Sequence, residues 1–318
     1  SSVRQPHPGR LSLMAAAGST PSAGFRCGYV AILGRPNVGK STLINHLLRF
    51  KLSIATAKPQ TTRHRIIGIQ NGDGYQIVYF DTPGMLEPAY RLQEMMMRAA
   101  RQAVADSDVI LFVTDSYDQP DAQDTALLDH LQTLGKPLVL AINKVDLARP
   151  EQLLRIIDAM QSRYRFEHVF PISALHGKNT DALEPALVSL LPEGEPLYSS
   201  EELTEHPERF FVAEIIREKI FLNYHDEIPY STAVVIDEFH EQPGRKDLIR
   251  ARIVVERDSQ KAIIIGKNGQ SLRMIGESSR KEIEAFLQRP VFLELWVAVR
   301  EKWRKRDSLL REMGYQQG

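Results

Sequence analysis

The sequence has a single cysteine, Cys27, among its 318 residues. An internal disulfide is therefore excluded, and Cys27, beside the start of an expected strand, is interpreted as a small buried hydrophobic residue. No apolar run approaches the roughly 20 residues that a membrane-spanning helix needs, so any membrane contact would be peripheral. The formal net charge is zero, because 40 basic residues balance 40 acidic ones. The total charge therefore indicates no particular class of partner.

The first 28 residues contain no acidic residue but include three arginines and several Ser, Ala and Pro. This composition predicts a disordered extension over residues 1–27. It is also typical of an organelle transit peptide. The alternative, which we favour, is that Met14 is the natural start and that the preceding residues are a tag or an over-extended gene call.

The segment Gly34–Ser41, GRPNVGKS, fits the pattern G-x-x-x-x-G-K-[ST] without a mismatch. A short apolar run, 28–33, precedes it, and apolar residues at helical spacing follow over 42–48. Strand, glycine-rich loop and helix in this order predict a phosphate-binding loop, in which backbone N–H groups and the helix N-terminus face the phosphates. Lys40 can then reach the outer phosphates and the Ser41 hydroxyl can bind Mg²⁺.

Strands that alternate with helices predict an α/β domain over residues 28–191, with a doubly wound, mixed sheet. The turn sequence Asn71-Gly72-Asp73-Gly74 predicts one antiparallel hairpin, and near-continuous apolar runs predict buried parallel strands. The polar stretch 51–65 is interpreted as a mobile loop. Expected strands cover 66–70, 75–80, 108–114, 137–142 and 169–172, and expected helices cover 122–134, 151–164 and 181–191.

Polar motifs follow three of these strands, at the sheet edge where ligands bind in α/β folds. They are Asp81-Thr82-Pro83-Gly84, Asn143-Lys144-Val145-Asp146 and Ser173-Ala174. Asp81 is placed to approach Mg²⁺. A carboxylate such as Asp146 can accept hydrogen bonds from N1–H and the 2-amino group of guanine, a pair of donors that adenine lacks. The motifs together predict a guanine nucleotide site.

With Thr61 and Thr62 of the polar loop, these motifs resemble the five signature elements of the translation-factor-related GTPases. The resemblance implies GTP hydrolysis with GTP or GDP and Mg²⁺ as cofactors. It places Asp146 and Asn143 on guanine, helped by the Ala174 backbone. Either threonine could be the switch ligand of the metal, and Thr62 is preferred because it directly precedes Arg63. The implied catalytic residues are Asn37, Lys40, Thr62 and Gly84. The implied metal ligands are Ser41, Thr61 or Thr62, and Asp81. The implied nucleotide-binding residues are Gly34, Arg35, Pro36, Asn37, Val38, Gly39, Lys40, Ser41, Thr42, Asp81, Gly84, Asn143, Lys144, Asp146, Ser173 and Ala174.

One position departs from the Ras-like pattern. Met85 follows Gly84 where Ras-like proteins place a glutamine that orients the attacking water. Relatives with an apolar residue here often use a potassium ion, with an asparagine at the position of Asn37 as a ligand. The resemblance therefore implies slow intrinsic hydrolysis that K⁺ stimulates.

The stretch 192–208 has six Glu and neither Lys nor Arg, which predicts an acidic hinge linker. A functional alternative is an acidic strip that mimics RNA or shields a basic domain. Residues 209–318, which hold 20 basic and 17 acidic residues, form the expected second domain. Its expected helices cover 209–221, 259–265 and 270–287, and its expected strands cover 231–239, 249–256 and 291–299.

This order of elements, with Gly266-Lys267-Asn268-Gly269 between two helices, resembles an α+β KH domain of the prokaryotic type. A two-glycine turn lets a phosphodiester backbone approach closely, and the eight Lys and Arg against three acidic residues in 245–273 add a salt-sensitive attraction. A solvated face, or a KH fold used for protein contacts, are the plainer alternatives. Trp303 either stacks on a base or packs, and we favour packing. The expected RNA-binding residues are Lys261, Ile265, Gly266, Lys267, Asn268, Gly269 and Arg273.

Over residues 27–315 the chain resembles the Era-like family of KH-domain GTPases. The resemblance implies a monomeric GTP-hydrolysing switch that binds the 3′ end region of small-subunit ribosomal RNA and assists assembly of the 30S subunit. It implies a cytoplasmic location, with peripheral contact at the inner membrane as an option, or a plastid or mitochondrion if 1–27 is a transit peptide. The rival is a GTP-dependent scaffold that recruits proteins or membrane lipids. The segments that carry the resemblance, besides Gly34–Ser41, are 60–65, 214–219, 228–231 and 293–297.

Overall fold

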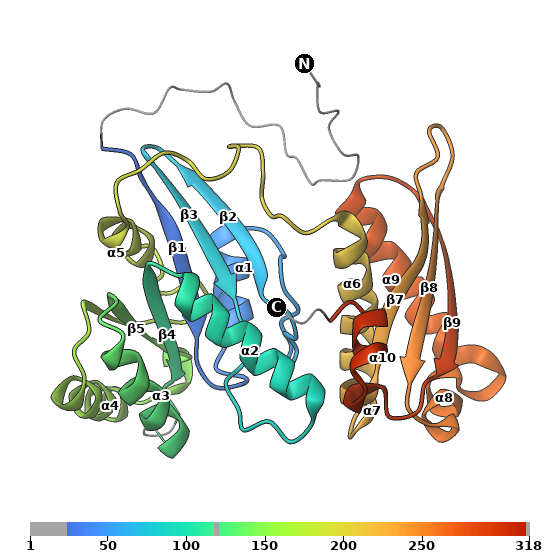
Figure 1. The fold of residues 1–318 in the computed structure, drawn as a ribbon, viewed down its shortest axis with the longest axis horizontal. Helices are drawn as coiled ribbons and strands as arrows, with labels where there is room; N and C mark the ends of the chain where they lie inside the picture. Colours follow the sequence, from blue (N-terminus) through green and yellow to red (C-terminus); the bar gives the residue numbers. More distant parts are fainter. Residues whose placement is uncertain (1–23, 118–120, 316–318) are drawn as a thin grey trace. The chain divides into compact units, whose positions relative to one another are not determined.

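The structure is a computed structural model that describes residues 24–117 and 121–315 (Figure 1). These residues divide into two compact units, one holding 24–87 and 96–205 and the other holding 88–95 and 206–315. The division after Glu205 falls inside the stretch predicted as a linker. Most of the expected N-terminal extension lies outside the described residues, whereas Arg26 and Cys27 already belong to the first strand, and Cys27 is buried as predicted.

The first unit contains the six-stranded sheet that the alternating pattern predicts, in the order β2-β3-β1-β4-β5-β6. All neighbouring strands are parallel except β2 and β3, which form the antiparallel hairpin expected from the Asn-Gly-Asp-Gly turn. β4 and β5 are almost completely buried, as parallel strands covered on both faces must be. The strands are β1 (Arg26–Leu33), β2 (Ile66–Gly72), β3 (Tyr75–Asp81), β4 (Val109–Asp115), β5 (Leu138–Asn143) and β6 (His168–Pro171).

Helices cover both faces of this sheet. Three of them contribute to one apolar cluster, through residues such as Ala103, Leu128 and Ile156, while α1 lies behind the sheet in Figure 1 and contacts β2 and β3. One helix, α2, was not predicted, although Leu92 and Ala103 lie on its buried side. The helices are α1 (Lys40–Leu48), α2 (Arg91–Asp106), α3 (Ala122–Thr133), α4 (Pro150–Arg163) and α5 (Leu183–Leu190), with a 3₁₀ turn η1 (Val145–Leu147). Residues 91–95 of α2 are grouped with the second unit.

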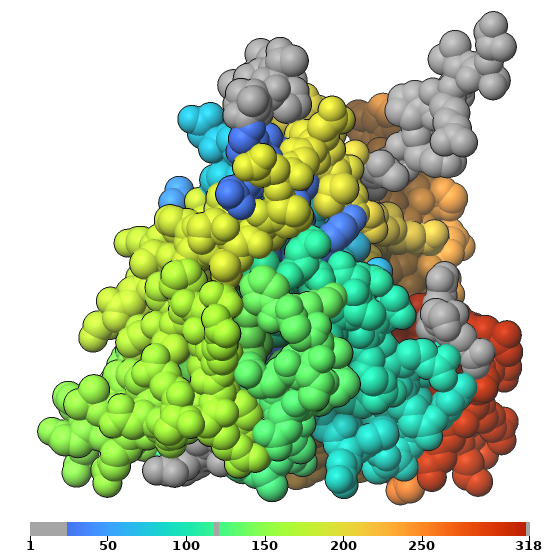
Figure 2. All heavy atoms as spheres, turned by 60° about the vertical axis from the view of Figure 1, so that its left-hand side comes forward, coloured from blue at the N-terminus to red at the C-terminus, as the bar shows by residue number. Residues whose placement is uncertain are grey.

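The acidic segment 192–205 does not run free of the first unit. Its backbone follows the edge of the sheet, where Ile69 N donates to Leu203 O at 2.8 Å and Thr204 Oγ1 donates to Ile67 O at 2.6 Å. The fully buried side chain of Gln76 accepts from two further N–H groups of the segment. Figure 2 shows the segment, in yellow, on the surface beside blue residues at the start of the chain's first strand. Composition predicted an acidic connection but not this attachment.

The second unit contains a three-stranded sheet in the order β7-β8-β9, antiparallel between β7 and β8 and parallel between β8 and β9. Helices α6, α8 and α9 bury one face of it in a single apolar cluster, which is the α+β arrangement predicted for this part of the chain. The elements are α6 (Glu208–Asn223), α7 (Ile228–Ser231), β7 (Ala233–His240), β8 (Asp247–Val255), α8 (Asp258–Ile265), a 3₁₀ turn η2 (Lys267–Gly269), α9 (Gln270–Leu287), β9 (Val291–Val299), a 3₁₀ turn η3 (Trp303–Lys305) and α10 (Asp307–Glu312).

Candidate functional site

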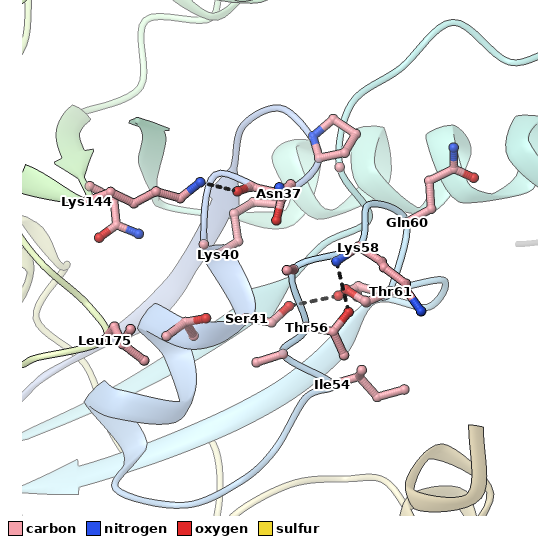
Figure 3. A pocket seen from close by; sticks show the side chains of 18 of the residues that line it. Asn37, Lys40, Ser41, Ile54, Thr56, Lys58, Gln60, Thr61, Lys144 and Leu175 are labelled. Atoms are coloured by element: carbon pink, nitrogen blue, oxygen red, sulfur yellow. Dashed lines mark hydrogen bonds between the residues drawn. The ribbon is translucent and has the colours of Figure 1, made fainter. Parts of the chain in front are cut away.

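The predicted phosphate loop connects β1 to α1 and contributes to a cavity at the carboxyl edge of the sheet (Figure 3). Gly39 has φ of 99°, and a Cβ added to it would lie 2.2 Å from Asn143 Nδ2. No other residue fits this position, because a side chain would collide with the neighbouring loop and strain the backbone. The loop and the β5 motif are therefore held in direct contact.

Lys40 is buried at the start of α1. Its ammonium group donates to the backbone oxygens of Gly34 at 3.0 Å and Arg35 at 2.7 Å. Burial lowers the pKa of Lys40 to about 8, and the negative charge of Asp81 opposes this shift. A buried cation at a helix N-terminus is an arrangement that attracts phosphate groups.

Three oxygen-bearing side chains meet next to this lysine. Ser41 Oγ lies 2.9 Å from Thr62 Oγ1 and donates to Asp81 Oδ2 at 2.9 Å. All three side chains are buried, and Asp81 Oδ1 accepts no hydrogen bond within the described residues. Burial raises the pKa of the Asp81 carboxyl. Hydroxyl and carboxylate oxygens with a free acceptor fit Mg²⁺, which takes few protein ligands and completes its shell with water and phosphate oxygens. Thr62, rather than Thr61, is the threonine that the structure brings to this cluster.

The motif that follows β5, Asn143 to Asp146, connects the loops on one side of the cavity. Asn143 Nδ2 donates to Val38 O, and Asn143 Oδ1 accepts from Ala174 N, both at 2.9 Å. The carboxamide therefore joins the phosphate loop to the Ser173-Ala174 loop. Lys144 Nζ donates to Asn37 O at 2.8 Å, as Figure 3 shows. Asp146 lines the cavity with a carboxylate oxygen 3.7 Å from His176 Nε2.

Most predicted nucleotide residues line this one cavity. Five predicted residues do not line it: Gly34, Arg35, Val38, Asp81 and Ala174. They contact lining residues instead, through the hydrogen bonds to Lys40, Ser41 and Asn143. Sequence reasoning missed a second set of lining residues. Some of these residues belong to the polar loop 51–65, and the others follow directly after strand ends or motifs. This position in the sequence could have identified them as lining residues. The missed residues are Ile54, Ala55, Thr56, Ala57, Lys58, Gln60, Tyr117, Leu147 and Leu175.

Arg35 of the phosphate loop is fixed by the start of α3. Its Nη1 lies 2.8 Å from Asp121 Oδ2, and its Nε lies 2.9 Å from Asp124 Oδ2. The Asp124 side chain is fully buried. Burial raises the pKa of Asp124 to about 6, with the Arg35 charge opposing the rise and Asp121 and Asp115 adding to it. Two carboxylates thus hold the first variable residue of the loop.

A second candidate site lies in the KH-like unit. Helix α8 ends at Ile265 and is followed by Gly266, which has φ of 71° and whose added Cβ would lie 2.2 Å from Ser271 Oγ. Gly269 has φ of 74° with open space around it, and Lys267 and Asn268 are exposed. The turn and one side of α9 form a groove with β9, lined by Gly269, Leu272, Arg273, Gly276, Glu277, Arg280, Leu293 and Leu295. Of the predicted RNA residues, Gly269 and Arg273 line this groove, and the others flank it on α8 and the turn.

Residues 29–144 match the family model described as 50S ribosome-binding GTPase, and residues 227–304 match the KH domain model. A GTPase Era from Geotalea daltonii is 48% identical over 292 residues, which are 92% of this chain and 98% of that protein. The chain belongs to the Era family of GTPases. It is accordingly a GTP-hydrolysing enzyme with a nucleotide domain and a KH domain.

Other Era relatives agree with this assignment. The chloroplastic GTPase ERA1 of Zea mays is 44% identical over 301 residues, 94% of this chain and 72% of that protein. An Era crystal structure from Aquifex aeolicus, bound to GDP·AlF4⁻, is 41% identical with a TM-score of 0.89 and covers 92% of this chain and 100% of its own. An Era complex with MgGDPNP and nucleotides 1506–1542 of 16S ribosomal RNA is 40% identical, with the same TM-score and coverage.

The Asp124 carboxyl predicts a pH dependence of stability. Its folded pKa of about 6 lies above the usual value of about 4, so the protonated form stabilises the fold and this contribution is lost as pH rises through 6. Between about pH 5 and 7.5, the Asp124→Asn variant should gain about 1 kcal/mol of unfolding free energy relative to wild type. Urea unfolding measures this difference. The exposed Asp129 of the same helix, changed to Asn, is the control; parallel pH profiles for wild type and Asp124→Asn would contradict the assignment.

Proposed function

We propose that the protein is a GTP-dependent switch that binds the 3′ end region of small-subunit ribosomal RNA and assists assembly of the 30S subunit. The observation that carries the proposal is the Gly266–Gly269 turn, which opens at the N-terminus of α9 onto a groove with an apolar floor of Leu293 and Leu295. Such a turn suits a phosphate backbone, and such a floor suits unstacked bases. The Era complex with a 16S ribosomal RNA fragment supports RNA as the partner class.

In this proposal the nucleotide site acts by position and charge. Ser41, Thr62 and Asp81 hold Mg²⁺, which neutralises charge on the phosphates, and the Lys40 ammonium leaves its carbonyl partners for the β and γ phosphates. Asp146 accepts from guanine, and Asn143 keeps the loops together. The Gln60–Arg65 loop, which carries Thr62, senses the γ-phosphate and thereby biases the RNA-binding unit.

We also propose an oligomeric state and a location. The protein acts as a monomer, its location is cytoplasmic, and contact with the inner membrane is at most peripheral. Among the helices of residues 24–117 and 121–315, none is both long and apolar enough to cross a bilayer. The rival function, a scaffold for proteins or lipids, is not favoured by the comparisons, and a steep fall of RNA affinity with salt would count against it because counterion release tracks phosphate contacts.

A matched pair of variants at Gly269 tests the RNA turn. Gly269 has a left-handed φ with no atom near its added Cβ, so both Asn and Asp can enter, and Asn and Asp tolerate this conformation better than other residues. Gly269→Asp should weaken RNA binding by about tenfold or more, because it brings a negative charge to the phosphates, while Gly269→Asn should bind within a fewfold of wild type. Titration of a labelled 16S ribosomal RNA 3′ fragment measures both. Equal affinities for the two variants would refute the assignment of this turn.

Potassium stimulation is tested at Asn37. This residue has a φ of 66° in the phosphate loop, and Met85, with its N–H on Gly34 O, offers no side-chain group to orient water. GTP turnover should be at least about tenfold faster in K⁺ than in Na⁺ at equal ionic strength, since even one preorganised donor at the developing charge typically contributes about a hundredfold. Asn37→Ala should lose this ratio and Asn37→Asp, which keeps an oxygen, should retain it. Equal rates in the two salts would show that no such ion acts.

A further inference from the structure

Beyond the groove, the turn that follows β9 concentrates positive charge. Five of the seven residues from Arg300 to Arg306 are Lys or Arg, and Glu301 is the only acidic one. From the sequence alone, we expect the basic neighbours of Trp303 to form an exposed face and nothing more. The structure shows which of its charges are available.

The turn is held from inside by Trp303. The indole is fully buried, its Nε1 donates to Ser231 O at 2.8 Å, and its ring stacks on Tyr315 at 6.1 Å. This rules out stacking of Trp303 on a base and confirms that it packs. Lys302, immediately before it, has a left-handed φ of 55°. The anchored indole fixes the backbone, so the flanking cations need not be ordered at the moment of binding.

The charges differ in what they contact. Arg304 turns inward, and its Nη2 lies 2.5 Å from Glu256 Oε2. The other four cations are exposed, and none forms an ion pair within residues 24–117 and 121–315. They are Arg300, Lys302, Lys305 and Arg306. Internal charge pairing therefore does not account for them, and their mutual repulsion favours an anionic partner.

The position of the turn relates it to the groove. Leu293 and Leu295 of β9 form the groove floor, and the turn begins where β9 ends. Arg300 N donates to Val255 O at 2.8 Å, which ties the turn to the end of β8. Arg300 is five residue steps along the chain from Leu295, a distance of about 16 Å at strand spacing. RNA that followed β9 from the groove toward Val299 would reach the turn within a few nucleotides.

We propose that the basic turn, residues 300–306, binds the phosphodiester backbone of RNA that continues past the KH groove. This inference rests on the proposed RNA-binding function. RNA is favoured over an anionic lipid surface because stable membrane docking combines basic residues with an inserted apolar group. Here the exposed residues of the turn are all charged, and the indole is buried.

The test compares two RNA lengths on the full chain. The long probe is an RNA with the sequence of nucleotides 1506–1542 of 16S ribosomal RNA, as in the Era complex. The short probe is the shortest fragment of it that wild type still binds. The variant carries Lys302→Gln, Lys305→Gln and Arg306→Gln. A control with the same charge change carries Arg98→Gln, Arg101→Gln and Arg155→Gln, three exposed positions of the first unit.

The variant should bind the long probe about tenfold more weakly or worse, and the slope of log K against log salt should shrink by up to about 2, since each single-strand phosphate contact contributes about 0.7. The short probe and the control variant should show no change, and Lys302→Arg with Lys305→Arg should bind the long probe like wild type. Unchanged long-probe binding, or an equal loss on both probes, would overturn the proposal. So would loss of binding to phosphatidylglycerol vesicles with long-probe binding intact, which would identify a lipid partner. If wild type binds neither RNA, the proposed function itself fails.

Discussion

Lys40 places an ammonium group inside the first unit, supported by two backbone oxygens and close to the buried carboxylate of Asp81. Burying two charges away from water costs several kcal/mol each unless partners compensate. Phosphate groups and a divalent cation are such partners, since one meets the ammonium and the other the carboxylate. The fold follows this constraint: β1, β3 and β5 each end at the same sheet edge, and Gly39 and Asn143 clamp their loops together.

Much of this architecture could be predicted because its signals are local. Apolar runs predicted the buried strands, and the Asn-Gly-Asp-Gly turn predicted the antiparallel hairpin. The spacing of the glycines predicted the turns at Gly34–Ser41 and Gly266–Gly269. Helix α2 was not predicted, although Leu92, Met96, Ala100 and Ala103 fall at helical spacing and are buried, a local signal that could have identified it. The attachment of 192–205 to the sheet could not be predicted, because its hydrogen bonds, such as Ile69 N to Leu203 O and Leu197 N to Gln76 Oε1, join residues far apart in the sequence and leave no trace in composition.

The candidate nucleotide site likewise has a part that the sequence predicts and a part that only the structure shows. Lys40, Ser41, Thr62, Asp81 and Asn143 were predicted as a set and meet in space, while the role of Asn143 as a brace between two loops required coordinates. Residues such as Leu175 and Tyr117 line the cavity by location and have no chemical signature. The groove of the second unit could not be predicted either, because residues of α9 and Leu293 and Leu295 of β9 line it together and only the folded unit brings them into contact.

In the proposed function, bound nucleotide and bound RNA each change the affinity of the chain for the other. The most direct test is the RNA affinity of the full chain with a non-hydrolysable GTP analogue and with GDP, together with the affinity for each nucleotide with and without RNA. Because coupling is reciprocal, the two ratios must agree, and we expect a factor of about five or more. Equal RNA affinity in the two nucleotide states would contradict the account, leaving a GTPase and an RNA-binding domain that merely share a chain.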